Sequence, residues 1–270
     1  MKAIAIIEVV VVFSITLMLL VLISLSPMGQ WQRQVTHRPF IEYAVMITIP
    51  MLVLVAARRN LSDYGLSLQP FSYHLDVALT ALVPVALSAA PLAFLNYRQG
   101  KSALVLGGIQ IGLLFVLGGL LRRKPTRNND NLYLGGVFLI GFQLFAGFNM
   151  GNALSAFVFY IFFLGLGEEL LFRGYIQSRL NAVFGRPFRF YGVNWGWGVI
   201  IAAVLFGIMH VLNPGSLVKG DWQLAGWWGF WTFFAGLVLS FVREKTGSIV
   251  ASVILHGLPQ AIAYAYLGIQ

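Results

Sequence analysis

Long apolar segments separated by short polar connections make up most of the 270-residue chain. A helix needs about 20 mostly apolar residues to cross a bilayer, because it rises only about 1.5 Å per residue. The pattern therefore predicts an all-α protein, a polytopic transmembrane helical bundle of eight or nine membrane helices. The candidate segments are residues 3–25, 41–57, 75–95, 102–121, 132–149, 152–180, 192–212, 225–243 and 248–268.

The number of helices depends on residues 132–167, an apolar stretch that is too long for one simple span. The segment GFNMGN (147–152) could form a tight turn that divides this stretch into two helices. Lysine and arginine are enriched in cytoplasmic loops. With a cytoplasmic N-terminus, nine helices place most of the 18 Lys and Arg residues inside, whereas eight helices divide them almost evenly. We therefore expect nine helices, with the Glu168 end of its helix facing the cytoplasm.

The composition agrees with a membrane protein and limits its chemistry. The chain is 59% hydrophobic and only 10% charged, whereas soluble domains carry roughly 25% charged residues. The net charge of +9 fits basic residues that set topology and contact anionic lipid headgroups, so we expect membrane lipids and no nucleic acid as partners. With no cysteine, the chain cannot form disulfides, a thiolate nucleophile or a cysteine-ligated metal site. The tryptophans around DWQLAGWWGFW (221–231) are typical of an interfacial belt.

Two adjacent carboxylates, Glu168 and Glu169, lie inside an apolar segment. Ionisable groups at membrane depth are costly, and they usually mark a functional site. Residues four apart share a helical face, so we expect Glu169 and Arg173 to form an ion pair. Neighbouring residues point about 100° apart, since a helix has 3.6 residues per turn. This leaves Glu168 without that partner and available for proton transfer.

Two histidines, His210 and His256, also lie in or at the ends of apolar segments. Phe206 precedes His210 by four residues and Gln260 follows His256 by four, so each pair shares one helical face. A glutamate and a histidine can polarise a water molecule, and a second histidine with an amide can donate to an oxyanion. The pattern thus permits a hydrolytic site. Each of these polar residues could alternatively serve only to hold helices together.

A proline interrupts the last apolar segment, next to His256. Pro259 lacks an N–H and its ring clashes with the carbonyl four residues earlier, so we expect a kink. We expect Gly257 to add flexibility at the same point.

Three short motifs resemble those of a known family. EELLFR (168–173) matches EExxxR, FGIMH (206–210) matches FxxxH, and HGLPQ (256–260) is similar to HxxxN or HxxxD. Their order, spacing and apolar context resemble the CAAX protease and bacteriocin-processing (CPBP, or ABI) family of intramembrane endopeptidases. The resemblance covers roughly residues 150–270. Residues 1–149 resemble the family only in forming membrane helices.

This resemblance implies a glutamate-dependent endopeptidase without a cofactor. Residues 150–270 would form the catalytic helical core and residues 1–149 the N-terminal membrane helices of one continuous membrane domain. The implied base is Glu168 acting with His210, and the implied oxyanion hole contains His256 and Gln260. The implied site residues are Glu168, His210, His256 and Gln260 as catalytic groups, with Glu169, Arg173 and Phe206 in support. Gln260 departs from the family pattern, which is consistent with a tolerated change, altered specificity or lost activity.

The resemblance also implies a substrate class and a location. The substrate would be a CaaX tail, a leader peptide or a membrane-bound protein, with or without a lipid, in a bacterial cell membrane. Three alternatives stay open: a zinc-dependent version of the protease with Glu168, His210 and His256 as ligands, an inactive scaffold or regulator, and a proton-coupled transporter. The zinc-protease signature HExxH and the GxSxG nucleophile elbow are both absent from the chain.

Overall fold

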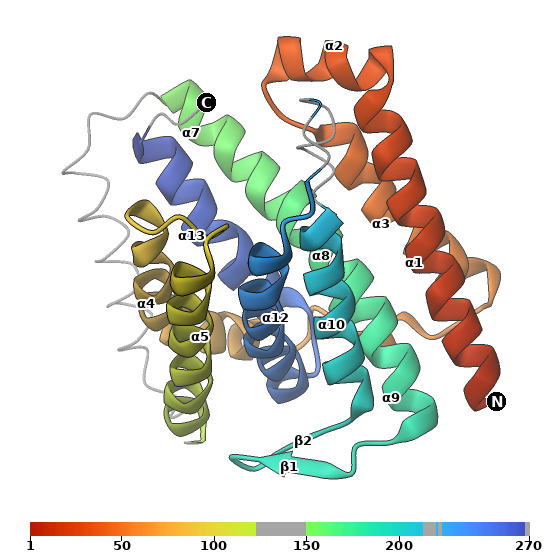
Figure 1. Cartoon of the computed structure of the whole chain (residues 1–270). Coiled ribbons are helices and arrows are strands. Elements are labelled where there is room, and N and C mark those ends of the chain that lie inside the picture. Colours follow the sequence, from red (N-terminus) through yellow and green to blue (C-terminus); the bar gives the residue numbers. More distant parts are fainter. Residues whose placement is uncertain (123–149, 213–219, 221–222, 268–270) are drawn as a thin grey trace.

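The computed structural model describes residues 1–122, 150–212, 220 and 223–267, and this part of the chain is mostly helical (Figure 1). The predicted helix at 132–149 lies outside the described residues. The α-helices are α1 (Lys2–Leu25), α2 (Pro27–Thr36), α3 (Phe40–Ala56), α4 (Phe71–Ala89), α5 (Gly100–Leu121), α7 (Met150–Phe157), α8 (Leu166–Glu169), α9 (Ser178–Phe184), α10 (Trp197–Leu212), α12 (Gly226–Thr246) and α13 (Val250–Leu267). Short 3-10 turns occur at η1 (Leu61–Tyr64) and η2 (Ala90–Ala93).

The described residues contain four helices that are long and apolar enough to cross a membrane, or five if α2 and α3, bent by 118°, form one span. The predicted count of eight or nine membrane helices is therefore not confirmed. Helix α10 and the part of α13 at Val250–Tyr264 are apolar but shorter than a full span. The four full-length candidates are Lys2–Leu25, Phe71–Leu92, Gly100–Leu121 and Ala153–Phe184.

A β-hairpin replaces the first part of the helix that was predicted at 192–212. Strands β1 (Phe188–Phe190) and β2 (Val193–Trp195) pair in antiparallel register and are joined by Tyr191 and Gly192. Both turn residues have positive φ, 47° and 81°, as the common two-residue hairpin turn requires. Among the described residues the hairpin is the exception to the predicted all-α fold, and α10 begins only at Trp197.

The candidate functional residues lie on or around one long helical segment, residues 150–184, which we call the central helix. It joins α7, α8 and α9 through two π-helical stretches, η3 (Val158–Gly165) and η4 (Leu170–Gln177). π-Helical turns are rare and are frequent at functional sites. Helices α3, α10 and α13 all pack against the central helix.

Glycines allow α13 to approach the central helix closely. A Cβ atom on Gly257 would lie 2.2 Å from the carbonyl oxygen of Tyr160, and one on Gly165 would lie 3.0 Å from that of Val253. Gly257 therefore serves close helix packing, and the flexibility expected there from the sequence stays a prediction. Helix α13 continues through Pro259, and the kink expected at this proline stays a prediction.

Candidate active site

The predicted ion pair between Glu169 and Arg173 is confirmed. Arg173 Nη1 donates to Glu169 Oε1 at 3.0 Å, and both side chains have zero exposure. Arg173 Nη2 also donates to the carbonyl of Gly236 in α12 at 3.2 Å. Its guanidinium lies 4.4 Å from the ring centroid of Phe206, within the range of a cation–π contact. Arg173 thus joins the central helix to both α10 and α12.

His256 lies between the two adjacent glutamates. Its Nδ1 is 2.9 Å from Glu169 Oε1, and its Nε2 is 3.5 Å from Glu168 Oε2. The sequence predicted that Glu169 and Glu168 would point in different directions, and it did not predict a shared partner. An imidazole ring presents two nitrogens on different edges, so the one ring of His256 meets both carboxylates.

Tyr43, in α3, is a site residue that the sequence did not predict. Its hydroxyl donates to Glu168 Oε1 at 3.4 Å. The second oxygen of Glu168, Oε2, is buried and accepts no hydrogen bond from a described residue. Tyr43 lies in the half of the chain that carries none of the three motifs, so no sequence signal indicated it.

His210 is fixed by its own helix and by two aromatic rings. Its Nδ1 is 2.8 Å from the carbonyl oxygen of Phe206, a distance at which the Nδ1–H donates to that carbonyl. This tautomer leaves Nε2 as a hydrogen-bond acceptor. Ring centroids of Phe206 and Trp228 lie 4.5 and 5.2 Å from that of His210.

One cavity of about 970 Å³, which we call the catalytic cavity, brings together residues of all three motifs. Its lining includes Glu168, His210, His256 and Gln260. Phe206 and Tyr43 also line it, whereas Glu169 and Arg173 do not. The remaining lining is mainly apolar and includes Leu82, Leu113, Val238, Trp228 and Trp231. Trp228 and Trp231 thus contribute to the cavity, beyond the interfacial role predicted for them.

The described residues include no group of three or more His, Asp or Glu side chains placed to hold a metal ion. The possible ligand set of Glu168, His210 and His256 therefore does not fit a zinc site in this structure.

A second ionic cluster fixes the other end of the central helix. Glu8 in α1 accepts hydrogen bonds from Arg59, Arg179 and Tyr175 at 2.7, 3.0 and 2.6 Å. The hydrogen bond with Glu8 raises the pKa of Arg59 above its ordinary value, so the guanidinium stays charged. This cluster ties the first helix of the chain to α9.

Comparison with known proteins identifies a related family for the part of the chain that carries the three motifs. Residues 150–262 match the family model described as type II CAAX prenyl endopeptidase, Rce1-like. All three motifs fall inside the match, which confirms the resemblance to CPBP endopeptidases for this part of the chain. No curated protein and no solved structure gave a match. The match and the apolar helices together indicate an integral membrane protein related to CAAX-type endopeptidases.

Proposed function

We propose that the protein is an intramembrane endopeptidase in which Glu168 activates the attacking water. One observation carries the proposal: the three motifs, far apart in sequence, contribute side chains to a single cavity. The family match supports peptide-bond hydrolysis as the reaction. The proposed substrates are membrane-bound peptides or proteins, of CaaX or leader type.

The two acceptors in the cavity suit the activation of water. The hydroxyl of Tyr43 occupies one oxygen of Glu168 and leaves Oε2 to accept a proton. His210 Nε2 offers a second acceptor in the same cavity, because its Nδ1–H is held by the Phe206 carbonyl. Water that binds both groups loses a proton to Glu168 as its oxygen attacks the peptide carbonyl. Glu168 then returns the proton to the leaving amine.

In the proposed mechanism, His256 and Gln260 stabilise the oxyanion. Both ring nitrogens of His256 face carboxylate oxygens, which accept hydrogen bonds, and Nδ1 donates to Glu169 Oε1 at 2.9 Å. Its Nε2 contact with Glu168, 3.5 Å, is longer than an ordinary hydrogen bond, so this N–H can donate to the substrate instead. The amide of Gln260, one turn further along α13, supplies a second donor.

The mainly apolar walls of the catalytic cavity strengthen these interactions. Hydrogen-bond donors aimed at a developing charge act more strongly where water is excluded and the dielectric constant is low. Tyr43 comes from residues 1–149 and the motifs from residues 150–270, so the proposed site needs both halves of the chain as one membrane domain.

The first test is cleavage of a peptide panel by the detergent-purified protein. The panel contains one CaaX sequence in farnesylated, geranylgeranylated and unlipidated form, and one leader peptide, with products identified by mass spectrometry. We expect cleavage of at least one peptide and no loss of rate after treatment with a chelator. Loss of activity with the chelator, restored by zinc, would contradict the metal-free mechanism. A folded protein that cleaves no peptide would contradict the proposal and favour the inactive scaffold.

A second test addresses the departure at Gln260. If its amide donates to the oxyanion, Gln260→Ala lowers kcat by roughly 10²–10³-fold, the usual effect of removing one such donor. Gln260→Asn keeps the amide and restores the residue common in the family, so we expect it to retain activity. Equal activity of Gln260→Ala and the wild type would remove Gln260 from the mechanism.

A further inference from the structure

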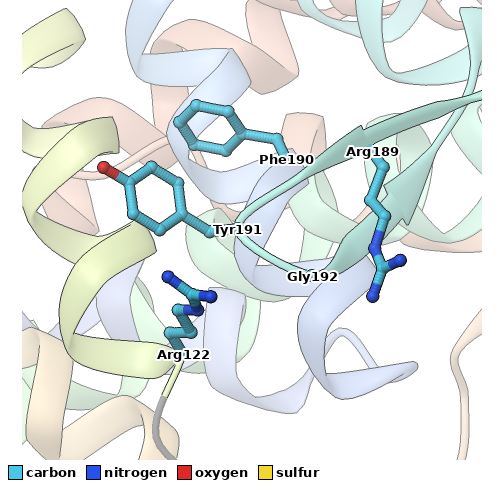
Figure 2. Close-up of a pocket in the computed structure, with 5 residues that line it drawn as sticks. All are labelled: Arg122, Arg189, Phe190, Tyr191 and Gly192. Atoms are coloured by element: carbon cyan, nitrogen blue, oxygen red, sulfur yellow. The ribbon is translucent and has the colours of Figure 1, made fainter.

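A second hollow lies away from the catalytic cavity, where the end of α5 meets the turn of the β-hairpin (Figure 2). Its volume is about 760 Å³, and none of its lining residues lines the catalytic cavity. We call it the arginine notch. It is lined by Arg122, Arg189, Phe190, Tyr191 and Gly192.

Packing holds the hairpin turn against α5. The ring of Tyr191 covers Gly118, where a Cβ atom would lie 2.5 Å from the ring. The ring of Phe190 contacts those of Phe115 in α5 and Phe241 in α12, with centroids 5.5 and 5.8 Å apart. The walls of the notch are therefore fixed by the membrane helices.

Two positive charges share the notch, and none of its described lining residues carries a carboxylate. Figure 2 shows the guanidiniums of Arg122 and Arg189 on either side of Gly192. Both side chains are exposed, and neither forms an ion pair with a described residue. Arg186, close by in sequence, is instead paired with Glu244 at 2.6 Å. An anion bound between the two guanidiniums would offset their repulsion and accept paired hydrogen bonds.

The position of the notch along the bundle indicates which anion it meets. Arg122 directly follows α5, one of the spanning candidates, so it lies where the hydrocarbon ends and the headgroups begin. Just before it, Val116 and Leu120 on α5 are about half exposed, as expected of side chains that face acyl chains. Tyr191, 37% exposed, is a residue type enriched at this level of the bilayer.

Other basic residues gather at the same end of the bundle. The hairpin and the N-terminus lie at this end and α2 lies at the opposite end (Figure 1). Lys2 contacts the ring of Phe184 here, and Arg59 and Arg179 meet at Glu8. Enrichment of Lys and Arg at one end of a membrane protein indicates its cytoplasmic side, where the leaflet contains anionic lipids.

We propose that the arginine notch binds the phosphate group of an anionic membrane phospholipid. The guanidiniums of Arg122 and Arg189 donate to the phosphate oxygens, while the acyl chains run along the exposed apolar face of α5. The site is independent of the proposed peptidase chemistry. It would attach the hairpin, and with it the start of α10, to the membrane surface.

The test is native mass spectrometry of the full-length protein in detergent, titrated with phosphatidylglycerol, phosphatidylcholine or inorganic phosphate. We expect one phosphatidylglycerol to bind preferentially over phosphatidylcholine. The double variant Arg122→Gln/Arg189→Gln should weaken this binding at least about tenfold, because it removes both charge-assisted contacts. The matched control is Arg58→Gln, an exposed arginine next to Arg59 at the same end but outside the notch. We expect the control to bind like the wild type.

Three outcomes would overturn the proposal. The double variant would bind phosphatidylglycerol as the wild type does, the control would lose as much affinity as the double variant, or millimolar inorganic phosphate would displace the lipid. The last result would assign the notch to a free phosphate. Because both arginines are exposed, the melting temperature of the double variant should stay close to that of the wild type.

Discussion

Replacing Arg173 with methionine tests the buried charge cluster behind the catalytic cavity. Arg173 has zero exposure, and its guanidinium bonds both Glu169 and the Gly236 carbonyl. Removing one member of a buried ion pair costs about 3–5 kcal/mol, because the other charge stays buried without its partner. The lost contact with the Phe206 ring contributes up to about 2 kcal/mol of this. We therefore expect Arg173→Met to lower the free energy of unfolding by about 3–5 kcal/mol.

The assay is unfolding of the detergent-purified protein, for Arg173→Met, Glu169→Gln and the double variant. The double variant removes both charges, so it should cost at least about 1 kcal/mol less than the sum of the single variants. Arg186→Met is the matched control. Its side chain is 37% exposed, and its partner Glu244 keeps hydrogen bonds from two neighbouring side chains. We expect the control to cost about 1 kcal/mol or less.

Two results together would refute this reasoning. Arg173→Met would cost no more than Arg186→Met, and the effects of Glu169→Gln and Arg173→Met would simply add. The charges would then not be coupled, and the cluster could not hold His256 in the proposed orientation.

Two further predictions follow from single contacts. Gly257→Ala places a methyl group 2.2 Å from the Tyr160 carbonyl oxygen, so we expect a clear fall in melting temperature, while Gly108→Ala, with open space around it, should leave the melting temperature unchanged or raise it. Tyr43→Phe removes only the hydroxyl that bonds Glu168, so we expect kcat to fall roughly 3–10-fold, equivalent to a hydrogen bond of about 1 kcal/mol. An unchanged kcat would show that Tyr43 does not position the base.

The apolar pattern predicted most of the described helices, because a helix in lipid must be apolar over a nearly fixed length. The segments expected at 3–25, 41–57 and 102–121 correspond to α1, α3 and α5 with ends that differ by one or two residues. The hairpin was missed because its residues, FRFYGVNW (188–195), are as aromatic and apolar as a helix end. Its turn depends on positive φ at Tyr191, which no residue pattern signals.

The site was predictable where its contacts are local. Glu169 and Arg173 are four residues apart on one helix, and the spacing alone predicted their ion pair. The positions of His256 and Tyr43 beside Glu168 depend on how α13 and α3 pack against the central helix. Such tertiary contacts leave no periodic pattern. The family motifs indicated that His256 shares a site with Glu168, whereas nothing in the sequence indicated Tyr43.

The most direct test of the proposed mechanism is kcat for Glu168→Gln on the best peptide substrate, measured together with its melting temperature. Glutamine keeps the shape of the side chain but cannot accept the proton of the attacking water. The account predicts that kcat falls by roughly 10²–10⁴-fold while the protein stays folded. A folded Glu168→Gln protein that cleaves within about threefold of the wild-type rate would contradict the account, because this fall in rate is far smaller than the fall expected when a general base is removed.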